Sequence, residues 1–235
     1  LAQRADRAVR SLFKKTEGLF VPKSKHGEFS SSFRDKEWGN GYTEGNAWHH
    51  SFPPYAINAD TGGILAQLHG GKSQLLAKLH ELLETSGNYS PGSYGQEIHE
   101  MLEARAVAMG QYAHNNQPVH HILWLFGLLG DRKTTETLIR FVLHHAYGVD
   151  FFAGDEDNGE QGAWYVLSAL GLFATTPGTP FYEVGSPIFK HVRIARTPKP
   201  MLSPKVTGNS AVGYSQIDAS GITGGKEKFT DIVAL

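Results

Sequence analysis

Residues 65–83 read LAQLHGGKSQLLAKLHELL, and the leucines of this stretch recur at the spacing of an amphipathic helix. Side chains at that spacing lie on one face of an α-helix. We therefore expect a helix over 65–83 that packs through its leucine face. The same spacing occurs at residues 8–13, 97–112, 122–129, 138–147 and 163–173. The chain is thus predicted to contain about six helices.

The connections between these stretches are rich in glycine, proline, serine, asparagine and aspartate, as turns require. Alternating helices and loops predict antiparallel helix pairs. Long glycine-containing loops are typical of a helical barrel in which the loops meet at one end. After residue 181 the helical spacing stops, and short β-rich runs occur at 182–184 and 192–195. We predict a mainly α fold, with a helical region over 1–180 and a β-rich segment over 181–235.

The composition excludes several functional classes. With 235 residues, of which 40% are hydrophobic and 11% aromatic, the chain can build a core and is not a disordered protein. It contains 0 cysteines, which excludes thiol catalysis, cysteine-bound zinc and iron–sulfur clusters. A net charge of -1 gives no field for nucleic acid or an anionic membrane, and no apolar run is long enough to span a bilayer. The chain starts without methionine, so we expect a processed chain or a piece of a longer one.

The acidic segment 154–160, GDEDNGE, directly precedes the apolar stretch at 163. Its acids are typical of a solvated loop that faces the N-terminus of a helix. A calcium loop of the EF-hand type fails on register, because Gly159 falls at the fifth position and Val166 at the twelfth. Carboxylates flanked by glycine and aromatic residues also suit a general base that polarises a water molecule.

A second segment, WGNGYTEGNAW at 38–48, places one carboxylate among aromatic rings, glycines and amides. Aromatic faces bind the apolar side of a sugar while amides and carboxylates take its hydroxyls, so this composition is typical of a carbohydrate site. The alternative is structural: Thr43 or Asn46 caps a helix and Trp48 belongs to the core.

The 12 histidines raise the possibility of a zinc site. No HExxH motif occurs, and adjacent histidines on a helix point in different directions, so the pair His144-His145 does not chelate a metal by itself. The run His114-Asn115-Asn116-Gln117 places four polar side chains before Pro118, which can begin a helix. These residues either line a site or cap that helix.

Taken together, the ordered motifs resemble glycoside hydrolase family 92, the calcium-dependent exo-acting α-mannosidases. The resemblance covers about residues 38–192 and is carried by YTEGNAW at 42–48, GQYAHNNQPVHH at 110–121, GDED at 154–157, AWYVLSALG at 163–171 and GSP at 185–187. It implies an (α/α)6 barrel preceded by an N-terminal β-sandwich domain. The chain would then hold the C-terminal part of the barrel and the start of a β-element. It also implies a mannose-containing glycan as substrate and a secreted or otherwise extracytoplasmic location.

The resemblance implies a role for each matching residue. Glu44 matches the general acid of an inverting hydrolysis, and Asp155 and Asp157 match the pair that activates water. Calcium would bridge two sugar hydroxyls, and its implied protein ligands are Glu97 and Asp157. The implied substrate contacts are Trp48, Glu97, His114, Asn116 and Gln117. The alternatives are an inactive or truncated carbohydrate-binding remnant of this fold and an unrelated helical-repeat protein, for which no fixed period is present.

The chain departs from the family's motifs at a few positions close to the expected site. His49-His50 and Pro53-Pro54-Tyr55 replace the usual residues after the tryptophan, Gln96 stands where histidine is frequent, and Asn115 replaces a glycine. Because they lie near the site, these departures bear on substrate preference or activity, although the acids themselves are retained.

Overall fold

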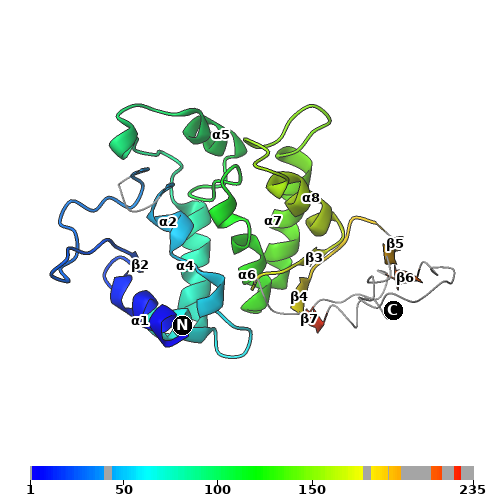
Figure 1. Cartoon of the computed structure of the whole chain (residues 1–235), viewed down its shortest axis with the longest axis horizontal. Coiled ribbons are helices and arrows are strands. Elements are labelled where there is room, and N and C mark those ends of the chain that lie inside the picture. The colour runs from blue at the N-terminus through cyan, green and yellow to red at the C-terminus, as the bar shows by residue number, and fades with distance from the viewer. Residues whose placement is uncertain are drawn as a thin grey trace, which may run out of the picture.

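The computed structural model describes residues 2–39, 44–176, 181–189, 191–196, 213–218 and 225–228. This part of the chain is mainly helical, as the sequence predicts, with short strands near its C-terminal end (Figure 1). The α-helices are α1 (Ala2–Leu12), α2 (Ala47–His50), α3 (Gly63–His69), α4 (Lys72–Glu84), α5 (His99–Val107), α6 (Ile122–Leu128), α7 (Arg132–His145) and α8 (Glu160–Ala169). Short 3₁₀ turns lie at Pro54–Ala56, Gly92–Tyr94 and Gln117–Val119.

The single helix predicted over 65–83 is wrong, because the structure divides this stretch into α3 and α4. Gly70 and Gly71 separate the two helices with φ values of 95° and 138°. Residues with side chains rarely adopt such backbone conformations, so two consecutive glycines allow the chain to break here. The leucine face survives the break: α3 packs against α4, and Leu65, Leu75 and Leu79 are all buried.

Two other helices end earlier than their apolar spacing predicts. α5 stops at Val107 because Ala108 takes the left-handed conformation, with φ of 56°. α8 stops at Ala169, and Gly171, with φ of 73°, leads directly into a strand. Met109, Tyr112 and Leu172, which lie beyond these helix ends, are still buried, so the apolar pattern continues where the helix does not.

The centre of the core is α6. Its buried side chains are Ile122, Leu123, Trp124, Leu125, Phe126 and Leu128. A helix that is apolar on every side lies inside the protein, and α6 accordingly packs against both α4 and α7. Even so, no helix in the described part of the chain is long and apolar enough to cross a membrane.

A side chain from α7 enters the backbone of α6. The hydroxyl of Thr135 donates to the carbonyl oxygen of Leu123 at 2.7 Å and accepts from the amide of Gly127 at 2.7 Å. In a regular helix these two backbone groups would bond to each other. Thr135 therefore ties α7 to α6 through a buried hydroxyl that satisfies both groups.

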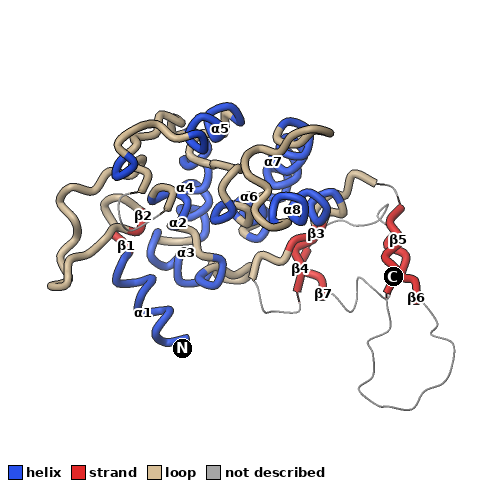
Figure 2. Tube along the Cα trace, turned by 45° about the horizontal axis from the view of Figure 1, so that its top comes forward, coloured by secondary structure: helices blue, strands red, loops and turns tan. Residues whose placement is uncertain are grey.

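The strands form small antiparallel sheets. β1 (Phe13–Lys14) pairs with β2 (Leu19–Phe20), and β5 (His191–Arg196) pairs with β6 (Gly213–Asp218). A three-stranded sheet has the order β3 (Leu172–Phe173), β4 (Phe181–Val184), β7 (Gly225–Lys228). The strands predicted at 182–184 and 192–195 are thus confirmed, and Figure 2 shows the C-terminal strands to one side of the helices. The β3–β4 pair spans the boundary predicted near residue 180.

Replacing Thr135 with valine tests the bond between α6 and α7. Valine has nearly the same shape but no hydroxyl, so the Leu123 carbonyl and Gly127 amide lose their buried partner. We expect the free energy of unfolding, measured by urea denaturation, to fall by about 2–4 kcal/mol. The matched control is Thr137→Val on the exposed side of α7, where the change should stay within about 0.5 kcal/mol. Equal losses for both variants would show that Thr135 contributes nothing specific.

Candidate active site

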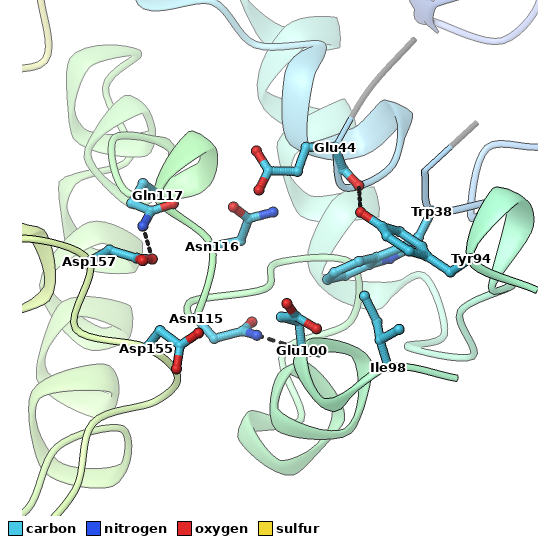
Figure 3. A pocket seen from close by; sticks show the side chains of 10 residues that line it. All are labelled: Trp38, Glu44, Tyr94, Ile98, Glu100, Asn115, Asn116, Gln117, Asp155 and Asp157. Carbon is cyan, nitrogen blue, oxygen red and sulfur yellow. Dashed lines mark hydrogen bonds between the residues drawn. The ribbon is translucent and has the colours of Figure 1, made fainter. Parts of the chain in front are cut away.

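The loops before α2, α5, α6 and α8 meet at a polar pocket of about 150 Å³ (Figure 3). Its lining residues are Trp38, Glu44, Tyr94, Ile98, Glu100, Asn115, Asn116, Gln117, Asp155 and Asp157. Four are carboxylates and three are amides, while the remaining three give one apolar wall. The structure therefore brings together Glu44, Asn116, Gln117, Asp155 and Asp157 from the residues that the sequence singled out.

The carboxylate of Glu44 is exposed and enters the pocket from the segment before α2. That segment is held at two points. The Glu44 carbonyl oxygen accepts from the Tyr94 hydroxyl at 3.2 Å, and Asn46 caps α2 by accepting from the amide of Trp48 at 3.1 Å. Asn46 also donates to Gln111 at 2.7 Å, which anchors the start of α2 to the loop after α5. Of the two caps that the sequence suggested, Asn46 is confirmed, and Thr43 lies outside the described residues.

Trp48, expected as a substrate contact, is not among the residues that line this pocket. It is only 2% exposed, and its indole nitrogen donates to Asp35 at 2.9 Å. The ammonium of Lys78 lies 4.3 Å from the centre of its ring. The structural alternative describes this residue, because its apolar surface is used for packing and its one donor is satisfied.

The acidic loop before α8 divides its carboxylates between two tasks. Glu156 accepts from the amides of Gly159 at 2.5 Å and Gly162 at 3.0 Å, so it caps the N-terminal end of α8. Asp155 and Asp157 line the pocket instead. The sequence left a capping loop and a catalytic loop as alternatives: Glu156 has the capping role, and Asp155 and Asp157 face the pocket, as a catalytic loop would require.

The backbone at Asp157 is held in an unusual conformation. Asp157, Asn158 and Gly159 are consecutive residues with φ values of 54°, 61° and 96°. Aspartate and asparagine tolerate this left-handed region better than most residues, but at some cost in energy. The side-chain amide of Gln117, which lies next to Asp157 in Figure 3, donates to the Asp157 carboxylate and fixes its orientation. In Figure 3, Asp157 and Glu44 extend into the pocket from opposite sides.

His114, another expected substrate contact, is fully buried and is not among the residues that line the pocket. The Tyr112 hydroxyl donates to its Nδ1 at 2.8 Å, and its Nε2–H donates to the Tyr147 oxygen at 2.7 Å. Tyr147 in turn donates to Gln161 at 2.9 Å, and Gln161 donates back to the His114 carbonyl oxygen at 3.3 Å. Burial and the nearby ring of His120 hold the pKa of His114 well below its usual range, so the ring is neutral.

A second histidine joins the same two segments. His120 is 2% exposed and donates from Nε2 to the His114 carbonyl oxygen at 2.8 Å and from Nδ1 to Glu160 at 3.0 Å. The bond from His120 lowers the pKa of the Glu160 carboxyl. The backbone carbonyl of His120 accepts from the Trp164 indole at 2.9 Å. These bonds attach α8, and with it the acidic loop, to the loop that carries Asn116 and Gln117.

Glu97, expected as a substrate contact and calcium ligand, is also absent from the pocket lining. It is exposed and forms an ion pair with Arg105 of α5. The pocket instead takes Glu100, three positions further along, in the first turn of α5. Within the described ranges no group of three or more His, Asp or Glu side chains is placed to hold a metal ion, and the zinc and calcium hypotheses gain no such cluster.

Three lining residues, Tyr94, Ile98 and Glu100, were not singled out from the sequence, and Trp38 and Asn115 were named there only within longer motifs. Asn115 lies inside the motif that supplied Asn116 and Gln117, so its neighbours were a usable signal. Glu100 follows Glu97 by nearly one helical turn, and only the exact start of α5 decides which of the two faces the pocket. Trp38, Tyr94 and Ile98 carry no charge pattern that distinguishes them from core residues.

Comparison with solved structures gives consistent relatives. The inverting mannosidase BT2199 of Bacteroides thetaiotaomicron, a family GH92 protein, has 38% identity and a TM-score of 0.60, with 78% of this chain and 25% of that chain covered. The α-mannosidase BT3965 of the same organism, solved with mannoimidazole, has 22% identity and a TM-score of 0.65, with 79% of this chain and 24% of that one covered. At this identity, the similarity to BT3965 bears on the fold alone. The chain thus spans about a quarter of the length of these relatives.

A search of curated protein sequences finds no match to this chain. A family model does match: the glycosyl hydrolase family 92 catalytic domain aligns with residues 2–218. This alignment covers most of the chain and includes every pocket residue described above. The chain therefore belongs to glycosyl hydrolase family 92.

Proposed function

We propose that this chain carries the acid and base side of an α-mannosidase active site that hydrolyses mannosidic bonds with inversion. The observation that carries the proposal is the meeting of Glu44, Asp155 and Asp157 at one polar pocket in a family 92 chain. A solved mannosidase that is 38% identical is described as inverting, which supports the same stereochemistry here.

We propose that the helices form part of an (α/α)6 barrel whose loops build the pocket, followed by a β-element from residue 181. The pocket is lined by loops that precede four different helices, which is the arrangement expected at one end of such a barrel. Because the chain spans about a quarter of its solved relatives, we include an N-terminal β-sandwich domain in the proposed whole enzyme. We also propose an extracytoplasmic site of action, on the family resemblance.

In the proposed mechanism Glu44 donates a proton to the glycosidic oxygen as the bond to the anomeric carbon breaks. A water molecule attacks the same carbon from the opposite face, and a carboxylate takes its proton. Inversion requires the acid and the base to stand about 6.5–9.5 Å apart, so that the water fits between the base and the sugar. The entry of Glu44 and Asp157 from opposite sides of the pocket suits this requirement (Figure 3).

Asp157 is our first candidate for the base, and Asp155 is the second. The donor from Gln117 and the left-handed backbone hold the Asp157 carboxylate in one orientation. A fixed carboxylate is better placed to orient a water molecule than a mobile one, because less ordering is required when the reaction begins. Asp155 lies on the same loop and lines the same pocket, so it remains the alternative.

A single sugar is the substrate group that the pocket suits. Trp38, Tyr94 and Ile98 give an apolar wall, and the amides and carboxylates give hydrogen-bond partners on the other sides. This combination of one apolar surface and several polar groups is typical of carbohydrate sites. The proposed acid and both candidates for the base line the pocket, so nothing in the described pocket favours the inactive remnant.

Calcium is proposed on the family resemblance, and the protein ligands expected from the sequence do not form a cage for it. Glu97 pairs with Arg105, Asp157 accepts from Gln117, and the described residues contain no cluster of three acidic or histidine side chains. Calcium usually takes six to eight oxygen ligands, so these residues alone would be too few. No step of the mechanism above is therefore routed through the ion.

The first test compares leaving groups in the enzyme that includes its N-terminal domain. Glu44→Gln removes the donated proton, so hydrolysis of a mannobiose should fall by about 10²–10⁴-fold. An aryl mannoside with a good leaving group needs less protonation and should lose much less. Asp157→Asn should slow both substrates alike, because water attack is needed for either.

The matched control is Glu156→Gln, an acid on the same loop that caps α8 outside the pocket. It should leave the ratio of the two rates unchanged. Equal losses on both substrates for Glu44→Gln would reject the acid assignment. If the single variant Asp157→Asn is active and the single variant Asp155→Asn is inactive, the base is Asp155.

Removal of calcium gives a separate prediction. If the enzyme requires calcium, treatment with a chelator should abolish mannoside hydrolysis and weaken mannoside binding, and added calcium should restore both. Binding is measured by isothermal titration calorimetry with and without chelator, and magnesium is the control ion. Full activity and unchanged affinity after exhaustive chelation would remove calcium from the proposal while leaving the acid and base assignments intact.

A further inference from the structure

Asn115 presents an unpaired oxygen atom to the pocket. The residue lines the pocket, yet it is only 4% exposed. Its amide nitrogen donates to the carbonyl oxygen of Glu100 at 2.8 Å and to the carboxylate of Glu103 at 3.2 Å. Because both partners are acceptors, they fix which end of the amide is nitrogen. The oxygen Oδ1 is therefore held in place, and it is buried without a hydrogen-bond partner.

Glu100 presents a second atom of the same kind. One of its carboxylate oxygens, Oε1, lies 3.4 Å from the ring nitrogen of His99. The other, Oε2, is buried and has no hydrogen-bond partner. Figure 3 shows both residues on the side of the pocket away from Glu44. Two buried acceptors are thus left unpaired on one wall, which folded proteins rarely permit without a ligand or an ordered water.

Packing keeps this wall rigid. A Cβ atom on Gly154 would meet the Asn115 Cβ at 2.6 Å and the Glu103 carboxylate at 3.1 Å, so Asn115 fills the space beside the acidic loop. The family resemblance expects glycine at position 115, which has no side chain to offer. By that resemblance, Asn115 adds an acceptor that a glycine lacks.

Two unpaired acceptors call for a ligand that brings hydrogen-bond donors or a positive charge. A cation is the weaker candidate, because Asn115 is neutral and the described residues offer no cluster of three acidic or histidine side chains. Hydroxyl groups are the stronger candidate, since each can donate one hydrogen to one oxygen. A sugar that occupied the pocket would bring several hydroxyls into reach of this wall.

We propose that Asn115 Oδ1 and Glu100 Oε2 each accept a hydrogen bond from a ring hydroxyl of the sugar in the pocket, at positions remote from the bond that is cleaved. The pair would make this chain select sugars that keep those hydroxyls. The inference rests on the proposed function, because it takes the pocket to be the site of the mannosyl residue.

The test is a double-mutant cycle in which a protein side chain and a sugar hydroxyl are removed singly and together, and the affinity is measured each time. Methyl α-mannoside and its monodeoxy analogues are titrated by calorimetry, with calcium present, into the enzyme with its N-terminal domain and the Glu44→Gln substitution, which prevents turnover. Asn115→Ala and Glu100→Gln are then compared in that background. Asn115→Ala keeps the Cβ that contacts Gly154.

We expect one deoxy analogue to bind about three- to tenfold more weakly than the parent sugar, and Asn115→Ala to cause the same loss for the parent sugar. The two losses should not add, because each removes one side of a single hydrogen bond. Glu100→Gln, and likewise removal of the sugar hydroxyl that Glu100 binds, should weaken sugar binding about ten- to hundredfold, since the acceptor is charged. The control Glu103→Gln, which touches Asn115 from outside the pocket, should leave every affinity within about twofold.

Several results would overturn the inference. Losses that add fully for every analogue would show that neither oxygen accepts from the sugar. Calcium binding is also measured without sugar. If both variants weaken it, and the losses of sugar affinity are again additive, the pair holds a cation. If Asn115→Ala does not fold, Glu100→Gln tests the second oxygen by itself. Failure of the parent mannoside to bind at all would reject the proposed function, whereas binding without coupling rejects only the hydroxyl pair.

Discussion

The carbonyl oxygen of His114 is the point on which the two halves of the pocket depend. It accepts from His120 at 2.8 Å and from Gln161 at 3.3 Å, so one backbone atom joins the loop before α6 to the first turn of α8. The neutral His114 ring and the Tyr147 hydroxyl close the same connection on the side-chain side. The four residues of this connection, His114, His120, Tyr147 and Gln161, are all buried or half-buried. Loss of one partner would leave polar groups unpaired in the interior, which makes this arrangement costly to distort.

This constraint explains how exposed carboxylates can keep a defined geometry. Asp155 and Asp157 are exposed, and an exposed loop would ordinarily move freely. Here Glu156 caps α8 and Glu160 pairs with His120, so two acids of the loop hold it in place while the other two face the pocket. One short acidic segment thus contains two acids that hold the loop and two acids that we propose as candidates for the base. The left-handed backbone at Asp157 is tolerated because its neighbours on both sides are fixed.

The sequence predicted the parts of this molecule that depend on local patterns. Helical spacing located every α-helix of the described residues except the short α2, and the helix ends that it missed depend on left-handed backbone at Gly70-Gly71, Ala108 and Gly171. The ordered motifs located Glu44, Asn116, Gln117 and the acidic pair of the pocket. They did not distinguish Trp48 and His114, which are conspicuous residues used for packing, from residues that face a ligand. That distinction depends on burial in three dimensions, as does the choice of Glu100 over Glu97.

The chemistry of the pocket favours a neutral ligand with several hydroxyl groups. Its walls carry four carboxylates, and the unpaired atoms of Asn115 and Glu100 are acceptors. An anionic ligand would be repelled, and an apolar one would leave these oxygens buried without partners. A neutral polyol avoids both penalties, since it carries no charge and donates through each hydroxyl. A site with buried acceptors rejects an analogue that lacks the matching hydroxyl far more strongly than an apolar pocket rejects a small change in shape. Discrimination between sugars should therefore reside in the oxygens of the wall away from Glu44, and the rate of cleavage in the carboxylates of the loops.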